Sequence, residues 1–278
     1  MPELPEVETV KNVLKKSILN KKINSIEIIY PKIIDLGDIN SLINEEFIDI
    51  KRKGKFLIFE TNNHYLVSHL RMEGKYFIKD NNLPIEKHEH IIFRFNDFSL
   101  RYHDTRKFGR MEIVNKNDLN KTPINNLGVD PIIDKINIDE IYPKFNKKMP
   151  IKTLLLDQSI ICGIGNIYVD EVLFLSKIDP NRLGNTIKLN ELELIVKNTI
   201  KILKESYFNE EELNKKEEEY YKKFGQLWYT SPVDDTDPNA QIKEIEKCIS
   251  LGKSKEDFLK DKTESEQQEF ETKWNEIN

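Results

Sequence analysis

The first residues of the chain can place a nucleophile beside an acid. If Met1 is removed, Pro2 exposes a secondary α-amine, and Glu3 follows it with a carboxyl group. An α-amino group titrates at about 7.7–8.0 when unperturbed, so an appreciable fraction is uncharged at neutral pH and can attack an electrophilic carbon. The iminium ion that forms withdraws electrons from a neighbouring C–H bond and so prepares an elimination. An ordinary amphipathic helix also fits this stretch, because apolar residues recur at helical spacing from Val7 to Ile18.

A cluster of basic residues in Lys51–Leu57 is the second candidate. Lysine or arginine occupies four of its seven positions, and Lys55 is the last of the four. Such a cluster could contact phosphate or a leaving base. It also fits an edge strand that lysines protect from pairing with other chains, which is a common arrangement.

Two further stretches combine an apolar side chain with arginine. Met72 lies in His69–Gly74, and Arg106 and Phe108 lie in Tyr102–Gly109. An enzyme that acts on one base of a duplex must extrude that base and fill the hole, which requires a flexible apolar wedge and a planar hydrogen-bond donor. The alternative is that the two apolar side chains belong to the core and that the arginine forms a surface ion pair.

A tight turn with two glycines joins two expected helices. Gly163-Ile164-Gly165 follows the helix that contains Lys152, and the next helix begins near Asn166. Backbone N–H groups at that helix start, without side chains in the way, could bind a DNA phosphate. The turn is not a dinucleotide-binding fingerprint, because the third glycine is absent and a helix precedes it.

Together these stretches resemble the formamidopyrimidine-DNA glycosylases. Residues Pro2 to Thr9 match that family over eight consecutive positions, and the resemblance continues in collinear order to about residue 205. It implies a bifunctional DNA glycosylase and abasic-site lyase for oxidised purines, such as 8-oxoguanine and formamidopyrimidines. The site residues that it implies are Pro2, Glu3 and Lys55 for catalysis, and Met72, Arg106, Phe108, Lys152 and Asn166 for DNA binding.

The resemblance also implies a role for each of these side chains. The Pro2 amine would attack C1′ while Glu3 protonates the deoxyribose ring oxygen, and β and δ eliminations would then cut the strand. Lys55 would position a phosphate and assist proton transfer. On the DNA side, Met72 would replace the flipped base, Arg106 would read the opposite cytosine, Phe108 would wedge beside it, and Lys152 and Asn166 would contact phosphate or the lesion pocket.

The elements that must position these residues indicate an α+β fold. Runs of β-branched and aromatic residues in near alternation, separated by turn signals, predict strands after the first helix. We expect an N-terminal antiparallel β-sandwich with a flanking N-terminal helix, followed by a helical helix–two-turn–helix domain. The expected strand runs are Lys22–Tyr30, Phe47–Glu60, Tyr65–Ile78, His90–Phe95, Leu100–His103 and Met111–Val114, and the expected helices are Ile138–Phe145, Ile151–Gln158, Asn166–Lys177 and Asn190–Lys204.

Composition divides the chain unevenly. We expect a catalytic β-sandwich domain at 1–125, a linker at 126–131, a helix–two-turn–helix DNA-binding domain at 132–205 and a divergent acidic region at 206–278. The last region holds 11 Lys plus Arg and 19 Asp plus Glu, out of 43 and 48 in the whole chain. This leaves 32 basic and 29 acidic residues in 1–205, so any DNA-binding surface should lie there.

The region 206–278 departs from the family pattern. Family members usually carry a four-cysteine zinc hairpin after the helical domain, whereas this chain has only Cys162 and Cys248. We therefore expect no zinc and no other cofactor. Ser254–Trp274 has the pattern of a helix, and the acidic tail could bind a protein partner.

The expected partner is double-stranded damaged DNA, bound by a monomer. No run approaches the roughly 18 apolar residues of a membrane span, so we expect no membrane association and a cytoplasmic location, on the nucleoid when bound to DNA. Two alternatives remain open. One is an endonuclease VIII-like glycosylase for oxidised pyrimidines, and the other is a non-catalytic protein that binds damaged DNA.

Overall fold

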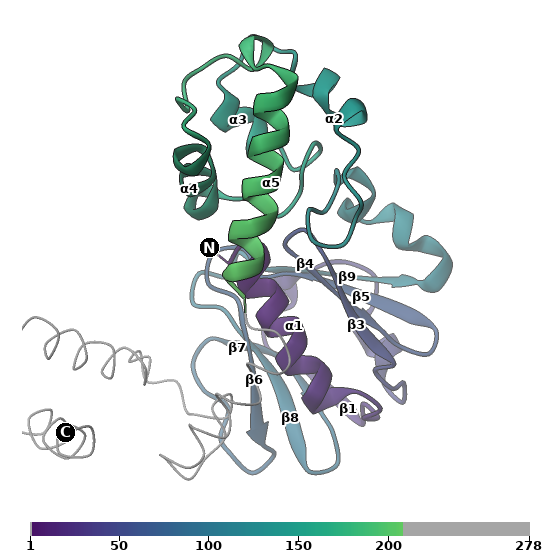
Figure 1. Cartoon of the computed structure of the whole chain (residues 1–278). Helices are drawn as coiled ribbons and strands as arrows, with labels where there is room; N and C mark the ends of the chain where they lie inside the picture. Colours follow the sequence, from purple (N-terminus) through teal and green to yellow (C-terminus); the bar gives the residue numbers. More distant parts are fainter. Residues whose placement is uncertain (1, 208–278) are drawn as a thin grey trace, which may run out of the picture. The chain divides into compact units, whose positions relative to one another are not determined.

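The computed structural model describes residues 2–207 of the 278-residue chain, and all of them belong to one compact unit. The predicted helix Ser254–Trp274 and nearly all of the acidic region 206–278 lie outside the described residues. Strands follow the first helix, and a group of helices ends this part of the chain (Figure 1). The helices and strands are α1 (Leu4–Ile18), β1 (Ser25–Ile28), β2 (Ile34–Leu36), β3 (Asp49–Lys53), β4 (Phe56–Glu60), β5 (His64–His69), β6 (Lys75–Asp80), β7 (Glu89–Arg94), β8 (Phe98–His103), β9 (Arg110–Asn115), α2 (Ile138–Phe145), α3 (Ile151–Leu155), α4 (Asn166–Ser176) and α5 (Leu189–Glu205).

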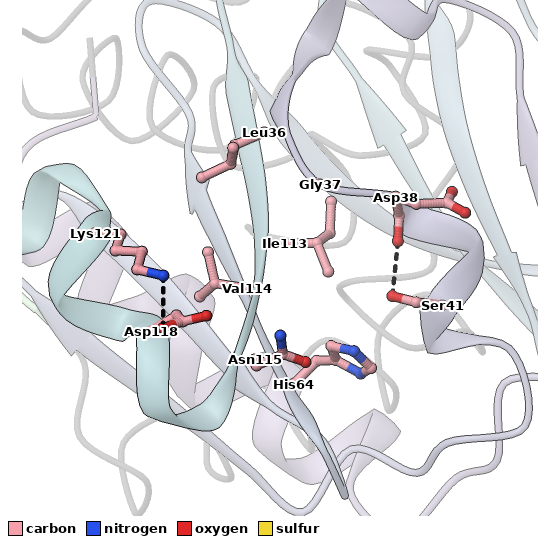
Figure 2. Close-up of a pocket in the computed structure, with 10 residues that line it drawn as sticks. All are labelled: Leu36, Gly37, Asp38, Ser41, His64, Ile113, Val114, Asn115, Asp118 and Lys121. Carbon is pink, nitrogen blue, oxygen red and sulfur yellow. Dashed lines mark hydrogen bonds and ion pairs between the residues drawn. The ribbon is translucent and has the colours of Figure 1, made fainter.

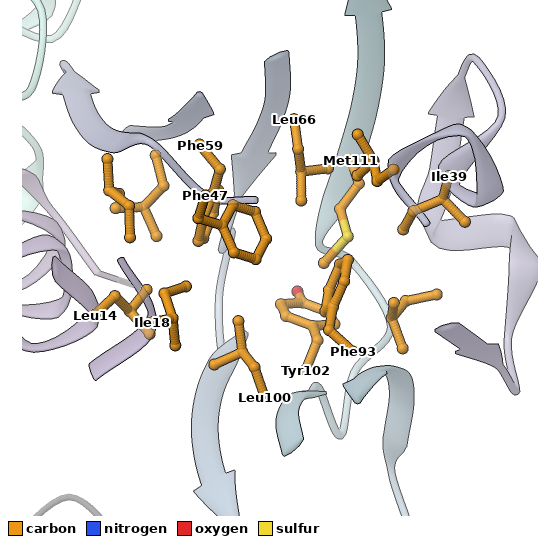
Figure 3. Packing of buried hydrophobic residues seen from close by; sticks show 14 of the residues in the cluster. Leu14, Ile18, Ile39, Phe47, Phe59, Leu66, Phe93, Leu100, Tyr102 and Met111 are labelled. Atoms are coloured by element: carbon orange, nitrogen blue, oxygen red, sulfur yellow. The ribbon is translucent and has the colours of Figure 1, made fainter. Parts of the chain in front are cut away.

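Two sheets share one apolar core, as the sequence predicts for a sandwich. The four-stranded sheet has the strand order β1-β7-β8-β6, and the five-stranded sheet has the order β2-β9-β5-β4-β3. Phe59 of β4 lies 5.5 Å from Tyr76 of β6, measured between ring centroids, so the core joins the two sheets. Leu14 and Ile18 of α1 pack into the same core (Figure 3). Each buried side chain of this size stabilises the fold by about 1.5–3 kcal/mol.

The strand predictions were right in kind but wrong in several boundaries. Phe47–Glu60 is not one strand, because the chain turns at Gly54 (φ +56°) and forms the hairpin β3–β4. Tyr65–Ile78 also divides, since β5 pairs with β4 and β9 whereas β6 pairs with β8 of the other sheet. The three-residue strand β2 was missed, and its pairing with β9 is parallel. Alternation of side chains does not show which sheet a strand joins.

The helix predictions were closer to the structure. α2 coincides with its predicted range, and the ends of α4 and α5 differ from theirs by no more than one residue. α3 stops at Leu155 because the amide of Gln158 donates to the carbonyls of Leu156 and Ile164, both at 2.9 Å, and so stabilises a turn. No helix within residues 2–207 is both long and apolar enough to cross a membrane.

A buried ion network centred on Arg52 joins three separate stretches of the chain. Its guanidinium donates from Nε to Glu8 Oε2 of α1 at 2.6 Å and from two nitrogens to Asp130, which follows the sandwich. Asp130 also accepts from Gly54 N at 2.8 Å, so it fixes the turn between β3 and β4. Burial alone would raise the pKa of Glu8, but hydrogen bonds from Lys11 and Arg52 outweigh it and lower that pKa.

Replacing Arg52 should therefore destabilise the protein strongly. In an Arg52→Ala variant, Asp130 is left buried without its cation and Glu8 keeps only Lys11, which costs about 3–5 kcal/mol of unfolding free energy. Urea unfolding of the full chain at pH 7 measures the effect. Lys51→Ala is the matched control, because Lys51 lies on the same strand but pairs with Glu60 near the surface, and we expect a change of no more than about 1 kcal/mol. A loss of similar size in both variants would contradict a special role for the network.

Candidate active site

The carboxyl group of Glu3 is buried at the first turn of α4. Only 2% of the residue is exposed, and Oε1 accepts a hydrogen bond from the backbone N–H of Ile167 at 3.0 Å. Oε2 is buried and has no hydrogen-bond partner within the described part of the chain. A buried polar atom without a partner is uncommon in native proteins and requires an explanation, such as a catalytic role.

Two glycines allow the N-terminus to approach α4 this closely. A Cβ on Gly165 would lie 2.2 Å from Glu3 Oε1, and a Cβ on Gly163 would lie 2.6 Å from Leu4 Cδ1. Gly163 has φ +99°, which favours glycine, and its carbonyl accepts from Leu4 N at 3.1 Å. The turn was predicted to leave helix N–H groups free for a phosphate. The structure shows that one of them, from Ile167, already donates to a carboxylate of the protein itself.

Glu6 and Tyr168 hold the backbone beside Pro2. Glu6 Oε2 accepts from Glu3 N at 2.8 Å, and Glu6 Oε1 accepts from the Tyr168 hydroxyl at 2.6 Å. Burial and the hydrogen bond to Glu6 raise the pKa of Tyr168 above its ordinary value, so the phenol keeps its proton and remains a donor. Pro2 itself is half-buried. Sequence patterns could not predict this pairing, because Glu6 and Tyr168 are 162 positions apart.

A pocket of about 290 Å³ adjoins this carboxylate. Lys55, from the turn between β3 and β4, is buried in it, and burial lowers the pKa of its amine although Glu3 and Glu6 act in the opposite sense. A lowered pKa increases the neutral fraction of the amine at a given pH. The pocket is lined by Lys55, Phe56, His69, Arg71, Leu127, Leu156, Gln158, Ile164, Gly165 and Asn166.

His69 and Arg71 are pocket residues that sequence reasoning did not select. The backbone N–H of Arg71 donates to His69 Nδ1 at 3.0 Å, so the proton of the imidazole lies on Nε2. Burial, with Arg71 and Lys55 nearby, lowers the pKa of His69 to about 3, and the ring is therefore neutral at physiological pH. Their position at the end of strand β5, next to the loop with Met72, was the available signal.

The predicted phosphate contacts Lys152 and Asn166 lie in different surroundings. Asn166 is the exposed first residue of α4 and lines the pocket. Lys152 is not among the pocket residues, and its Nζ forms an ion pair with Asp170 at 2.7 Å. Contact of Lys152 with a phosphate would require this half-exposed pair to open, which costs little at a surface.

Met72, Arg106 and Phe108 are all exposed on loops of the sandwich. Met72 is 41% exposed and Phe108 is 47% exposed, so neither belongs to the core. The guanidinium of Arg106 lies 4.9 Å from the centre of the Phe108 ring, a cation–π contact rather than an ion pair. The alternative that placed the two apolar side chains in the core is therefore wrong.

One hydroxyl brings these two loops together. A Cβ on Gly74, after Met72, would lie 2.4 Å from the Tyr102 hydroxyl oxygen, and a Cβ on Gly109, after Phe108, would lie 1.7 Å from the same atom. Both loops therefore pack closely on Tyr102 because each has a glycine there. The structure therefore brings Met72 and Phe108 to neighbouring loops. Side chains that together fill the hole left by an extruded base would have to lie on loops this close.

A second, larger hollow of about 380 Å³ shares no residue with this site. It lies beside β2 and β9, and Figure 2 shows the side chains that line it, among them His64, Asp118 and Lys121. Lys121 pairs with Asp118 at 2.9 Å, and His64 Nδ1 lies 2.9 Å from Glu45 Oε1. His64, Asp118 and Lys121 are thus already paired, whereas the pocket at Lys55 holds a buried amine close to Glu3.

The donor set of the chain does not fit the zinc site of the family pattern. Four thiolates cannot come from two cysteines, and Cys162 is fully buried beside Asp130. Burial raises the pKa of the Cys162 thiol to about 12. Within residues 2–207, no group of three or more His, Cys, Asp or Glu is arranged to hold a metal ion.

Comparison with known proteins identifies the family of the chain that forms this site. Residues 1–111 match the family model described as the formamidopyrimidine-DNA glycosylase N-terminal domain, and residues 127–215 match its H2TH domain. This pair of domains defines a DNA glycosylase of base excision repair. The formamidopyrimidine-DNA glycosylase of Mycoplasma genitalium is 45% identical over 211 residues, which cover 73% of this chain and 74% of that protein. The chain belongs to the formamidopyrimidine-DNA glycosylase family.

Further relatives and solved structures support the same family membership. The formamidopyrimidine-DNA glycosylase of Streptococcus agalactiae serotype III is 44% identical over 209 residues, covering 73% of this chain and 77% of that protein. The Lactococcus lactis Fpg, solved in complex with abasic-site DNA, has a TM-score of 0.70 at 38% identity and covers 73% of this chain and 78% of that chain. The predicted fold class is confirmed.

A methyl group at position 165 should disable the site without unfolding the protein. In Gly165→Ala the new Cβ meets the end of the Glu3 side chain, which can move aside, and the extended backbone (φ −136°) accepts alanine. Since a displacement of about 1 Å at a reacting group can cost about 100-fold in rate, we expect at least that loss of base excision. Single-turnover excision assays measure it. Ile167→Ala is the control, because Glu3 uses the backbone of Ile167, and equal losses in both variants would argue against the clash.

Proposed function

We propose that this glycosylase is bifunctional, that it excises oxidised purines and that it then cleaves the strand through a Schiff base on Pro2. The observation that carries the proposal is the buried Oε2 of Glu3, which has no hydrogen-bond partner among residues 2–207, lies one residue from Pro2 and adjoins the pocket of Lys55. A proton donor beside an amine nucleophile is the arrangement that glycosidic-bond cleavage with covalent capture requires. Removal of Met1 is part of the proposal, because only a free Pro2 amine can attack.

The proposed reaction moves two protons. The Pro2 amine attacks C1′ and the C1′–base bond breaks, so the base leaves with the bonding electrons and takes up the proton that the amine gives up. Glu3 Oε2 donates its proton to the deoxyribose ring oxygen, the C1′–O4′ bond breaks, and the nitrogen lone pair forms the iminium ion, which acidifies the hydrogen at C2′. Successive β and δ eliminations then release the phosphates on both sides of the sugar. Glu6 and Tyr168 keep the backbone of Glu3 in place during these steps.

Lys55 acts beside this centre in the proposed mechanism. Its lowered pKa makes the amine easier to deprotonate, so it can bind a phosphate as a cation or assist proton transfer as a base. His69, Arg71 and Asn166 line the same pocket and supply neutral and charged hydrogen-bond donors for a phosphate. No cofactor takes part.

Damaged double-stranded DNA is the proposed partner. Lactococcus lactis Fpg has been solved with abasic-site DNA and with DNA containing a formamidopyrimidine derivative, at 38–39% identity to this chain. Met72 would fill the place of the extruded base, and Arg106 and Phe108 would contact the base opposite. We further infer a monomer located in the cytoplasm and on the nucleoid, and a protein partner for the acidic region 206–278.

Substitutions at the first two mature positions should separate the two activities. Glu3→Gln removes the proton donor, and general acid catalysis contributes about 10²–10⁴-fold, so excision of 8-oxoguanine should fall by that factor. Cleavage of a preformed abasic site, which needs only the amine, should largely persist. Pro2→Gly should weaken both. Borohydride trapping on 8-oxoguanine:cytosine and abasic duplexes reports the covalent intermediate.

Two checks make this experiment decisive. Mass spectrometry of the intact protein establishes that Met1 has been removed, and chemical blocking of the N-terminus should abolish trapping. Full excision by Glu3→Gln would show that another residue is the acid. Absence of any adduct from folded protein with a free Pro2 would overturn the Schiff-base mechanism.

The lesion preference has its own test. We expect 8-oxoguanine or formamidopyrimidine duplexes to compete better than duplexes with an oxidised pyrimidine, by tenfold or more in rate, if Arg106 reads cytosine as proposed, since one good contact of that kind contributes about 1–3 kcal/mol of discrimination. Competition assays with mixed duplexes measure it. A preference for oxidised pyrimidines would favour the endonuclease VIII-like alternative.

A further inference from the structure

Asp104 fixes the loop that carries Arg106 and Phe108. The residue is fully buried, and its Oδ1 accepts from Arg106 N at 3.0 Å while Oδ2 accepts from Gly109 N at 2.8 Å. Its own N–H donates to the carbonyl of His88 at 3.0 Å. The carboxylate therefore closes the loop on itself, and the backbone of Asp104 ties the loop to the four-stranded sheet.

His90 of β7 makes a further contact with this backbone, whose carbonyl also accepts from Lys107 N at 3.3 Å. Only 4% of the residue is exposed, and its Nε2 lies 2.8 Å from the carbonyl oxygen of Asp104. A carbonyl can only accept, so Nε2 carries the proton. Nδ1 is buried without a hydrogen-bond partner in the described part of the chain. Of the two neutral tautomers, only the one with its proton on Nε2 makes this contact.

Positive and titratable groups surround this ring. Lys107, on the same loop as Arg106, has its Nζ 4.6 Å from the centre of the Tyr30 ring, and that ring lies 5.4 Å from His90. The His88 ring is 6.4 Å from His90. Burial lowers the pKa of His90, Lys107 and His88 add to the effect, and Asp104 opposes it.

We propose that His90 is a positioning residue for the loop Asp104–Gly109, and that its neutral imidazole holds Arg106 where it reads the base opposite the lesion. This inference rests on the proposed function, and it adds His90 to the residues that determine selectivity for the base opposite the lesion. His90 acts through the carbonyl of Asp104 and contacts no DNA in this scheme.

Acid should weaken this positioning. The pKa of His90 in the fold lies below the value of about 6.5 for an unperturbed histidine, so the neutral ring contributes fully above pH 6.5 and its contribution is lost as the pH falls through the lower value. A proton on Nδ1 would create a buried donor without an acceptor and a charge close to Lys107. Selectivity for the opposite base should therefore decline in acid, separately from the chemistry at Pro2.

The test compares substitutions of His90 in the full-length protein. His90→Gln keeps an N–H donor that can reach the Asp104 carbonyl but cannot titrate, whereas His90→Leu removes the donor. The readout is the ratio of single-turnover excision rates of 8-oxoguanine opposite cytosine and opposite adenine, from pH 5 to 8. His103→Gln is the matched control, because the ring of that histidine packs on Phe77 and His88 and its Nδ1 has no hydrogen-bond partner within the described residues.

We expect the wild-type ratio to fall about tenfold towards acid, the size of one lost base contact. His90→Gln should keep a high ratio at every pH, His90→Leu should have a low ratio at every pH, and His103→Gln should follow the wild type. A wild-type ratio that does not change with pH, or equal ratios in the Gln and Leu variants, would overturn the inference. If His90→Leu does not fold, the comparison of wild type with His90→Gln still decides. A wild-type protein that forms no trapped adduct would instead overturn the proposed function, and the inference with it.

Discussion

The buried guanidinium of Arg52 connects three parts of this enzyme whose relative positions must be kept: α1, the turn between β3 and β4, and the chain at Asp130. Through Glu8 it holds α1, whose N-cap residue is Glu3, and through Asp130 it holds the chain where the sandwich ends. Asp130 also binds the N–H of Gly54, the residue before Lys55. One cation therefore fixes both the helix that follows Glu3 and the turn that carries Lys55. An ion network of this kind is costly to bury, and its benefit is a defined geometry.

The candidate active site depends on contacts between residues that are far apart in the sequence. Glu3 is held by α4, and its close approach is possible because Gly165 has no side chain. Tyr168, one residue beyond Ile167, reaches back to Glu6. The start of α4 and the start of the chain thus form one structural unit, although the family models assign them to different domains. A substitution at the start of α4 should therefore alter the position of Glu3, and the reverse, since the two segments share the hydrogen bonds Ile167–Glu3 and Tyr168–Glu6.

The sequence was informative where structure is local and less so where it is not. Helical periodicity located α2, α4 and α5, and the glycine pair marked the turn that receives Glu3. Periodicity could not show that Arg52, in a cluster of four basic residues, is a buried structural cation while its neighbour Lys55 lines the pocket. That distinction arises from pairing with Asp130, 78 positions away. The short strand β2 was missed for a related reason, because three residues carry too little alternation to identify a strand.

The surroundings of Cys162 bear on the conditions in which such an enzyme works. Oxidised bases arise where oxidants are present, and oxidants attack thiolates much faster than thiols. Burial raises the pKa of the Cys162 thiol to about 12, so the side chain stays a thiol at neutral pH. The side chain is also fully buried behind Gly54. This cysteine is therefore chemically inert under oxidative stress, and the catalytic groups proposed here are an amine, a carboxyl group and a lysine, none of which is sensitive to peroxide.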